Sequence, residues 1–114
     1  MRVTVFHNDA RDAFDRHLGY DGYQTGHPMI EVFTFDGPDS NDPAELVAEN
    51  AFELFNVGDD PAFDTPAPVA VAYRAKGLRS LSVGDIVDVN GVPLACAKHG
   101  WQEVEHPRAS SVRH

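Results

Sequence analysis

The chain has 114 residues, a formal charge of −9 and 42% hydrophobic residues, which suits one small globular domain with a real core. The negative charge argues against a protein that coats DNA, because neutralising phosphates requires clustered Lys and Arg. No run of 18 apolar residues occurs, and the N-terminal residues lack the apolar stretch of a signal peptide. The single cysteine fits a reducing compartment, so we expect a cytoplasmic protein that does not enter a membrane.

The N-terminal half predicts two strands and two helices. Alternation of β-branched and aromatic residues predicts a strand over residues 2–6, and apolar residues at helical spacing predict a helix over 10–18. "MIEVFTFD", residues 29–36, alternates as a second strand does. A longer helix is predicted over 43–56, with Asp42 as its N-cap and Pro43 at its first position.

The C-terminal half predicts a sheet-forming segment. A proline-rich loop over residues 58–67 precedes a predicted strand over 68–75. "DIVDVNGVPLACA" predicts a β-hairpin that turns at Asn90-Gly91, and "WQEV" predicts a last strand. Residues 105–114 lack an apolar period and are predicted to be disordered. Residues 1–104 are therefore expected to form one α+β domain, with a mostly antiparallel sheet, two helices and a C-terminal β-hairpin.

Charge is distributed unevenly along the chain. Residues 37–65 contain eight acids and no Lys or Arg, whereas residues 66–114 contain six bases and four acids. Three of the acids, Glu45, Glu49 and Glu53, recur every four residues and should form one exposed row on the longer helix. Such a row can contact a basic protein, including a DNA-binding protein, or it can serve only to keep the chain soluble.

The segment "RSLSVGDIVDV", residues 79–89, allows a structural and a functional interpretation. Strand alternation would turn Leu81 and Val83 inward and Ser80 and Ser82 outward, so that the segment is the structural entrance to the hairpin. The two exposed serines could also form an edge that a protein partner recognises.

Two further classes of function remain open. A nucleic-acid-binding module would use Arg79, Lys98 and Trp101 at the weakly basic end of the chain. A small hydrolase-like enzyme would need a pocket that gathers residues such as His7, Ser80, Asp85 and His99.

Metal and cofactor sites have little support in the sequence. Cys96 and His99 stand three residues apart, but a zinc site needs at least one more converging protein ligand. No phosphate-binding loop, dinucleotide-binding motif or H-E-x-x-H motif occurs. We therefore predict no metal, no cofactor and no catalytic residue.

Two stretches of the chain resemble the YodL-like domain family. "ELFNVGDDPAFDTP" is similar to the family's helix that ends in a Phe-Asn pair, here Phe55-Asn56, and leads into a Pro-and-Asp loop. "GLRSLSVGDIVDVNGVPLACAKHGWQEV" is similar to the Ser-Leu-Ser-Val core that follows, up to the closing Gly100-Trp101. The chain differs in the longer insertion "TPAPVAVAYRAKG" between these stretches. The resemblance implies a setting in conjugative elements, plasmids or phages, and it implies no catalytic residue.

The interpretation that combines these observations is a non-enzymatic accessory protein that acts through protein contacts. Its expected contact residues are Glu45, Glu49 and Glu53 on the acidic helix, together with Ser80 and Ser82.

Overall fold

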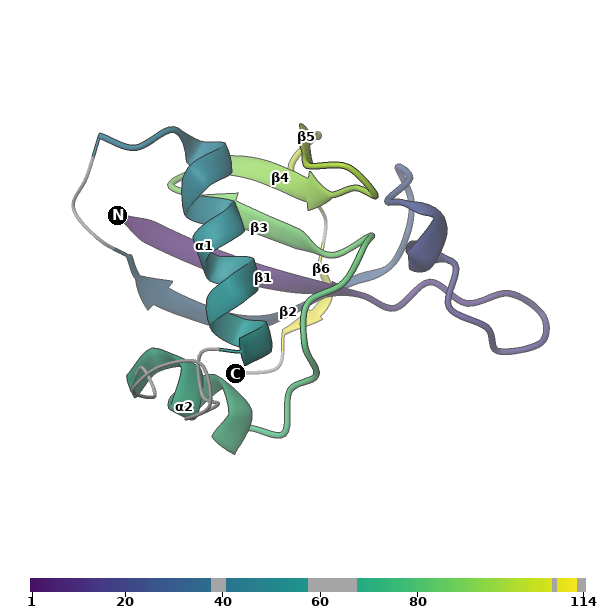
Figure 1. The fold of residues 1–114 in the computed structure, drawn as a ribbon. Coiled ribbons are helices and arrows are strands. Elements are labelled where there is room, and N and C mark those ends of the chain that lie inside the picture. The colour runs from purple at the N-terminus through teal and green to yellow at the C-terminus, as the bar shows by residue number, and fades with distance from the viewer. Residues whose placement is uncertain (38–40, 58–67, 108, 113–114) are drawn as a thin grey trace.

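The sheet at the centre of the protein places the first strand of the chain in the middle (Figure 1). A computed structural model describes residues 1–37, 41–57, 68–107 and 109–112. The strands in these ranges are β1 (Arg2–Asn8), β2 (Met29–Asp36), β3 (Ile86–Val89), β4 (Val92–Cys96), β5 (Trp101–Glu103) and β6 (Ala109–Val112). They form one sheet in the order β5-β4-β3-β1-β2-β6, antiparallel except where β6 runs parallel to β2. The α+β fold class is confirmed.

Helix α1 (Ala44–Val57) crosses one face of the sheet, and α2 (Pro68–Ala75) lies beside α1 at the β2 side, as Figure 1 shows. Phe55 of α1 stacks on Tyr73 of α2 at 4.3 Å between ring centroids, and both rings meet Phe33 of β2 edge to face. Val3, Val5, Val87 and Val89 from the central strands complete this core. The helices are therefore fixed to the sheet by an aromatic cluster at their junction.

The opposite face of the sheet carries a smaller core and the C-terminal segment. Phe6, Met29, Ile86 and Ala95 form this second cluster, against which Val104 packs. Beyond Val104, His106 Nε2 lies 2.9 Å from Asp88 Oδ2, although that oxygen accepts no aligned hydrogen bond from the described residues. The chain thus passes from β5 at one edge of the sheet to β6 at the other edge.

The predicted strands 2–6 and 29–36 and the predicted helix 43–56 are confirmed with small shifts at their ends. The hairpin is also confirmed. Asn90 and Gly91 adopt positive φ angles of 52° and 93°, as a two-residue turn between twisted strands requires, and the Asp88 carboxylate accepts the N–H of Gly91. The predicted loop 58–67 lies outside the described residues.

The helix predicted over residues 10–18 is wrong, because side chains there bond to their own backbone instead. The carboxylate of Asp12 accepts the N–H groups of Phe14 and Arg16, and Asp15 takes a left-handed φ of 62°. Arg11 and His17 form an isolated β-bridge, followed by a 3₁₀ turn over Gly19–Asp21. Phe14, one of the apolar residues at helical spacing, is 79% exposed.

The strand predicted over residues 68–75 is also wrong, because this segment is helix α2. Its buried residues, Ala70 and Tyr73, stand three apart, whereas Val71 is 49% exposed. A short apolar run can fit the period of a helix or that of a strand, and Pro68 suits the first residue of a helix. The count of two helices was therefore right, but one of them was placed in the wrong segment.

Strand β6 differs from the disorder expected for residues 105–114. Ala109–Val112 pairs in parallel with Met29, Ile30 and Glu31 of β2. Two serines within this short strand give it no apolar period, so the sequence carries no strand signal there.

Candidate functional site

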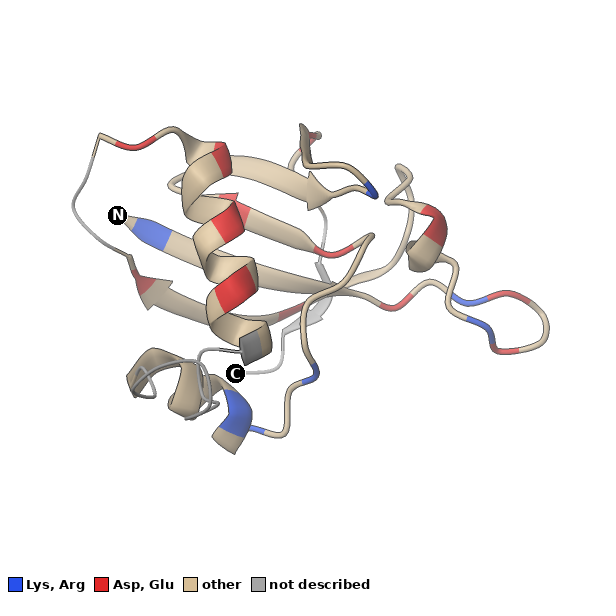
Figure 2. Cartoon of the chain, in the orientation of Figure 1, with Lys and Arg blue, Asp and Glu red and all other residues tan. Residues whose placement is uncertain are grey.

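The outward face of α1 carries the predicted acidic row. Val47, Ala48, Ala51 and Phe55 are buried against the sheet and α2, which turns the other side of the helix to solvent. Glu45, Glu49 and Glu53 are all exposed on that outer side, and Figure 2 shows the acidic positions following one another along the helix. Residues four apart in an α-helix rise about 6 Å along its axis. The prediction of one exposed row is confirmed, and we call these three residues the acidic row.

No cation neutralises the acidic row within the described part of the chain. Glu45 and Glu53 form no ion pair with a described residue, and residues 37–65 contain no Lys or Arg. Glu49 Oε2 accepts the indole N–H of Trp101 at 2.7 Å, and this donor carries no charge. No described cation therefore offsets the carboxylates on the outer face of α1, and each like-charged pair four residues apart costs a few tenths of a kcal/mol.

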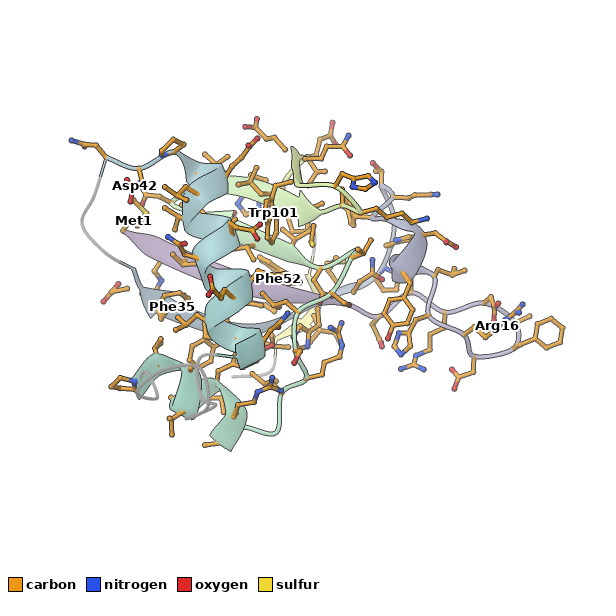
Figure 3. The ribbon with its side chains drawn as sticks, viewed as in Figure 1. Met1, Arg16, Phe35, Asp42, Phe52 and Trp101 are labelled. Atoms are coloured by element: carbon orange, nitrogen blue, oxygen red, sulfur yellow. The ribbon has the colours of Figure 1, made fainter. Side chains whose placement is uncertain are left out.

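Trp101 is fixed against α1 rather than presented to a ligand. Its ring meets Phe52 edge to face at 6.1 Å, and Figure 3 shows the two side chains between α1 and the β4–β5 end of the sheet. The predicted nucleic-acid-binding residues are not brought together, because Arg79 and Lys98 line two different cavities. A base stacked on Trp101 would also lie beside the carboxylate of Glu49.

The Ser-Leu-Ser-Val-Gly-Asp segment is held by backbone contacts to α1. Asn56 accepts the Leu81 N–H at 2.7 Å and donates to the Leu81 carbonyl at 3.1 Å, so one amide side chain satisfies both backbone groups of that residue. Leu81 itself is buried, as predicted. Ser80 and Ser82 are half-buried rather than fully outward, and the Ser80 hydroxyl accepts a hydrogen bond from Arg74. These contacts give the segment a structural role.

Asp85 forms a buried polar network that the sequence did not predict. The carboxylate is 1% exposed and pairs with both terminal nitrogens of Arg79, at 2.6 and 2.7 Å. It also accepts the N–H groups of Asn8 and Ser82, so four donors compensate its burial. Burial alone would lower the pKa of Arg79, but the hydrogen bond and charge of Asp85 raise it, which keeps the guanidinium charged.

A signal for this pair was present in the sequence. Arg79 and Asp85 flank a short loop that opens an apolar strand, where a charged residue needs a partner if it is to be buried. Sequence reasoning instead assigned Arg79 to nucleic-acid binding and Asp85 to a catalytic pocket. The structure joins the two residues to each other.

Of the four residues of the hydrolase-like alternative, His99 is set apart, and the other three make hydrogen bonds within the fold. His7 bonds to the Tyr73 hydroxyl, Asp85 to Arg79 and Ser80 to Arg74, whereas His99 lies in a separate cavity near Cys96. Burial, followed by the charges of Asp85 and Glu49, raises the pKa of the Cys96 thiol to about 11, so it is a poor nucleophile at neutral pH. Among the described residues, no three His, Cys, Asp or Glu side chains converge as metal ligands would.

Comparison with models of known protein families, with curated proteins and with solved structures found no match. The resemblance to the YodL-like family therefore stays a prediction. In the ranges that the structure covers, no helix has the length and apolar character to cross a membrane.

Proposed function

We propose that this chain is a non-enzymatic accessory domain of the cytoplasm that acts through protein contacts, with the acidic row on α1 as its contact surface. One observation carries the proposal. Three carboxylates stand one helical turn apart on an exposed face and have no cationic partner among the described residues. The helix beneath them is held by a buried aromatic core, so the row has a fixed geometry in the free protein.

The partner that fits this surface is a protein with a complementary row of Lys or Arg. Complementary charge speeds the encounter of two proteins and disfavours wrong partners, and a rigid row fixes the register of the contact. A DNA-binding protein is one class of basic partner. We propose a setting in a mobile genetic element or phage on the YodL-like resemblance alone. Ser80 and Ser82 are left out of the surface, because the hydroxyl of Ser80 and the backbone of Ser82 already bond within the fold.

The test compares charge reversals at two places on the protein. The double variant Glu45→Lys/Glu53→Lys changes the acidic row without touching Glu49, whose carboxylate bonds to Trp101. The control Asp21→Lys/Glu103→Lys makes the same change in net charge at two other exposed acids. Each protein is used as bait in lysate of the source organism, with and without nuclease treatment, and the retained proteins are quantified by mass spectrometry.

A partner retained by the wild type and the control, and lost by the Glu45/Glu53 variant, supports the proposal. Equal retention by all three proteins would remove the acidic row as the contact surface. Recovery that disappears after nuclease treatment would instead favour nucleic-acid binding, which predicts an affinity that falls steeply with salt.

A further inference from the structure

A polar cavity of about 270 Å³ lies where β1 ends and β2 begins, beside the segment that follows α2. Five of its lining residues carry basic or imidazole side chains and one is an acid, namely His7, Arg11, His17, Lys76, Arg79 and Asp9. Apolar lining comes from Ile30, Val32 and Leu78. In a chain with a formal charge of −9, a cavity with three permanent cations and one carboxylate stands apart from the rest of the molecule.

The three cations differ in how far their charge is compensated. Arg79 is held by the two short bonds to Asp85, so it belongs to the fold. Arg11 makes longer ion pairs, at 3.6 Å to Asp9 and 3.4 Å to Asp15, and these are exposed and weak. Lys76 forms no ion pair with any residue in the described ranges. Its ammonium lies 5.7 Å from the centre of the Phe33 ring.

The wall beside His7 and Arg79 is preorganised by a chain of hydrogen bonds. The Tyr73 hydroxyl donates its only proton to the Arg79 carbonyl, which can act only as an acceptor. The contact of 2.6 Å between His7 Nε2 and the same hydroxyl must therefore have the imidazole as donor. This assigns the proton of His7 to Nε2 and fixes the ring, which is 8% exposed.

The two other described cavities have a different character. The cavity along α1 is lined by Phe35, Asp42, Val47, Asn50, Ala51 and Leu54 and contains no cation. The cavity near Cys96 balances one lysine, Lys98, against Asp21. Among the described cavities, the one at Lys76 is thus alone in combining an uncompensated cation, a fork-shaped guanidinium and apolar walls.

We propose that this cavity binds a small phosphate monoester. The phosphate group would pair with Lys76 and Arg11, while the organic part would lie against Ile30, Val32 and Leu78. Lys and Arg are the side chains that bind phosphate most strongly, and ligand sites commonly combine apolar walls with a few polar anchors. The volume suits a molecule of a few carbon atoms. This site is separate from the acidic row, and neither proposal depends on the other.

The proposal is tested by titrating the full chain, labelled with ¹⁵N, at constant ionic strength. The probes are glycerol 3-phosphate and inorganic phosphate, with acetate and chloride as references. We expect saturable amide shifts for residues 7–11 and 76–79, with glycerol 3-phosphate binding at least threefold tighter than inorganic phosphate because it also reaches the apolar wall.

Two variants locate the site. Lys76→Ala removes an exposed side chain and should weaken glycerol 3-phosphate binding at least tenfold while leaving the rest of the spectrum unchanged. Lys98→Ala removes the same charge at another cavity and should leave the affinity unchanged. Arg11→Ala provides a second test on a different element and should weaken binding at least threefold.

Three results would overturn the proposal. They are shifts that do not saturate or that match those of chloride, acetate binding as tight as that of either phosphate, and unchanged affinity in Lys76→Ala. Tighter binding of inorganic phosphate than of glycerol 3-phosphate would also contradict it, because a free-anion site does not use the apolar wall.

Discussion

Asp85 shows how one residue connects distant parts of this chain. Its carboxylate is bonded to Arg79 before it, to the N–H of Ser82 within its own loop and to the N–H of Asn8 at the end of β1. A carboxylate that is only 1% exposed needs all of these donors, because an uncompensated buried charge is costly. The network fixes the entrance to β3 and one wall of the cavity at Lys76.

Removal of this carboxylate should destabilise the fold strongly. Asp85→Ala removes the carboxylate that pairs with Arg79 and accepts two backbone N–H groups, and breaking a fully buried ion pair costs roughly 3 to 5 kcal/mol. Arg79 keeps 37% exposure, so we expect about 2 to 4 kcal/mol, measured as the loss in the free energy of unfolding in urea. The control Asp21→Ala should change stability by less than about 0.5 kcal/mol. A loss below about 1 kcal/mol for Asp85→Ala would contradict the central role of the network.

The neighbouring segment permits a matched pair of substitutions. Leu81→Ala should cost roughly 2 to 4 kcal/mol, because its side chain is buried in the main core. Ser82→Ala should stay within about 0.5 kcal/mol, since the contact of Ser82 with Asp85 uses the backbone. Urea unfolding of both variants measures the difference. Unfolding of the domain by Ser82→Ala would show that its hydroxyl has a structural role that these contacts do not explain.

The thiol of Cys96 should make stability depend on pH in the alkaline range. Its pKa is raised from 9.0 to about 11 in the folded protein, chiefly by burial, so the folded state holds its proton more tightly than the unfolded state does. The resulting stabilisation is fully present below about pH 9 and is lost as pH rises towards 11. Urea unfolding between pH 8 and 11 should show a decline that is smaller in Cys96→Ala. Alkylation at pH 8 should be slow until the protein is unfolded, and rapid alkylation of the folded protein would contradict the raised pKa.

At the scale of elements, prediction from sequence succeeded where a signal had one structural meaning. Asn90-Gly91 between alternating apolar residues specifies a tight hairpin, and Asp42-Pro43 before an apolar stripe specifies the start of α1. Prediction failed where the same residues fitted both the helical and the strand period. Residues 68–75 form a helix whose Tyr73 packs on Phe33 and Phe55, and these contacts are made between segments distant in sequence. Residues 10–18 became a loop because Asp12 competes with the helical hydrogen bonds.

The same limit applies to the candidate site. The acidic row follows from helical spacing alone and could be predicted, whereas the contacts of Trp101 with Glu49 and Phe52 need the relative placement of β5 and α1. The cavity at Lys76 is built from four segments that only the folded chain brings together. Local patterns therefore predict which residues share one element, and they do not predict which elements meet.

The hairpin turn should tolerate glycine at both central positions but not alanine at the second. Gly91→Ala places a Cβ on a residue with a φ of 93° and should cost about 1 to 2 kcal/mol. Asn90→Gly is the matched control, because glycine adopts a φ of 52° without strain, and it should change stability by less than about 0.5 kcal/mol. Urea unfolding compares the two variants. Equal stability of Gly91→Ala and the wild type would mean that the turn can change its type.

For the whole molecule, the C-terminal segment adds contacts to the second core cluster and to the outer edge of the sheet. It packs Val104 on the second core, places His106 beside Asp88 and ends in β6 at the free edge of β2. Both main clusters, however, take their buried members from residues before 97. The segment therefore adds to a fold that is already closed around its main core.

Removal of residues 105–114 should leave a folded protein of lower stability. A loss of about 1 kcal/mol corresponds to a fall of roughly 4 to 8 °C in the thermal midpoint for a domain of about this size. Hydrogen exchange should accelerate at the β2 amides that face β6 and stay slow in β1 and β3. His106→Ala separates the contact with Asp88 from the strand pairing, because it should leave the β2 amides protected. Complete unfolding of the truncated chain would show that β6 is essential to the sheet.

The central place of β1 also sets the order in which the sheet can be completed. β1 pairs with β2 across a short separation, but its other edge stays open until β3 arrives, and the bond from Asn8 to Asp85 spans 77 residues. Contacts of such high contact order form slowly, and a strand edge that waits for its partner can pair with another chain. During synthesis, the β1–β2 hairpin would therefore be exposed to self-association until the hairpin of β3 and β4 has emerged from the ribosome. The acidic charge of residues 37–65, which emerge in that interval, would repel neighbouring nascent chains while β1 is still unpaired.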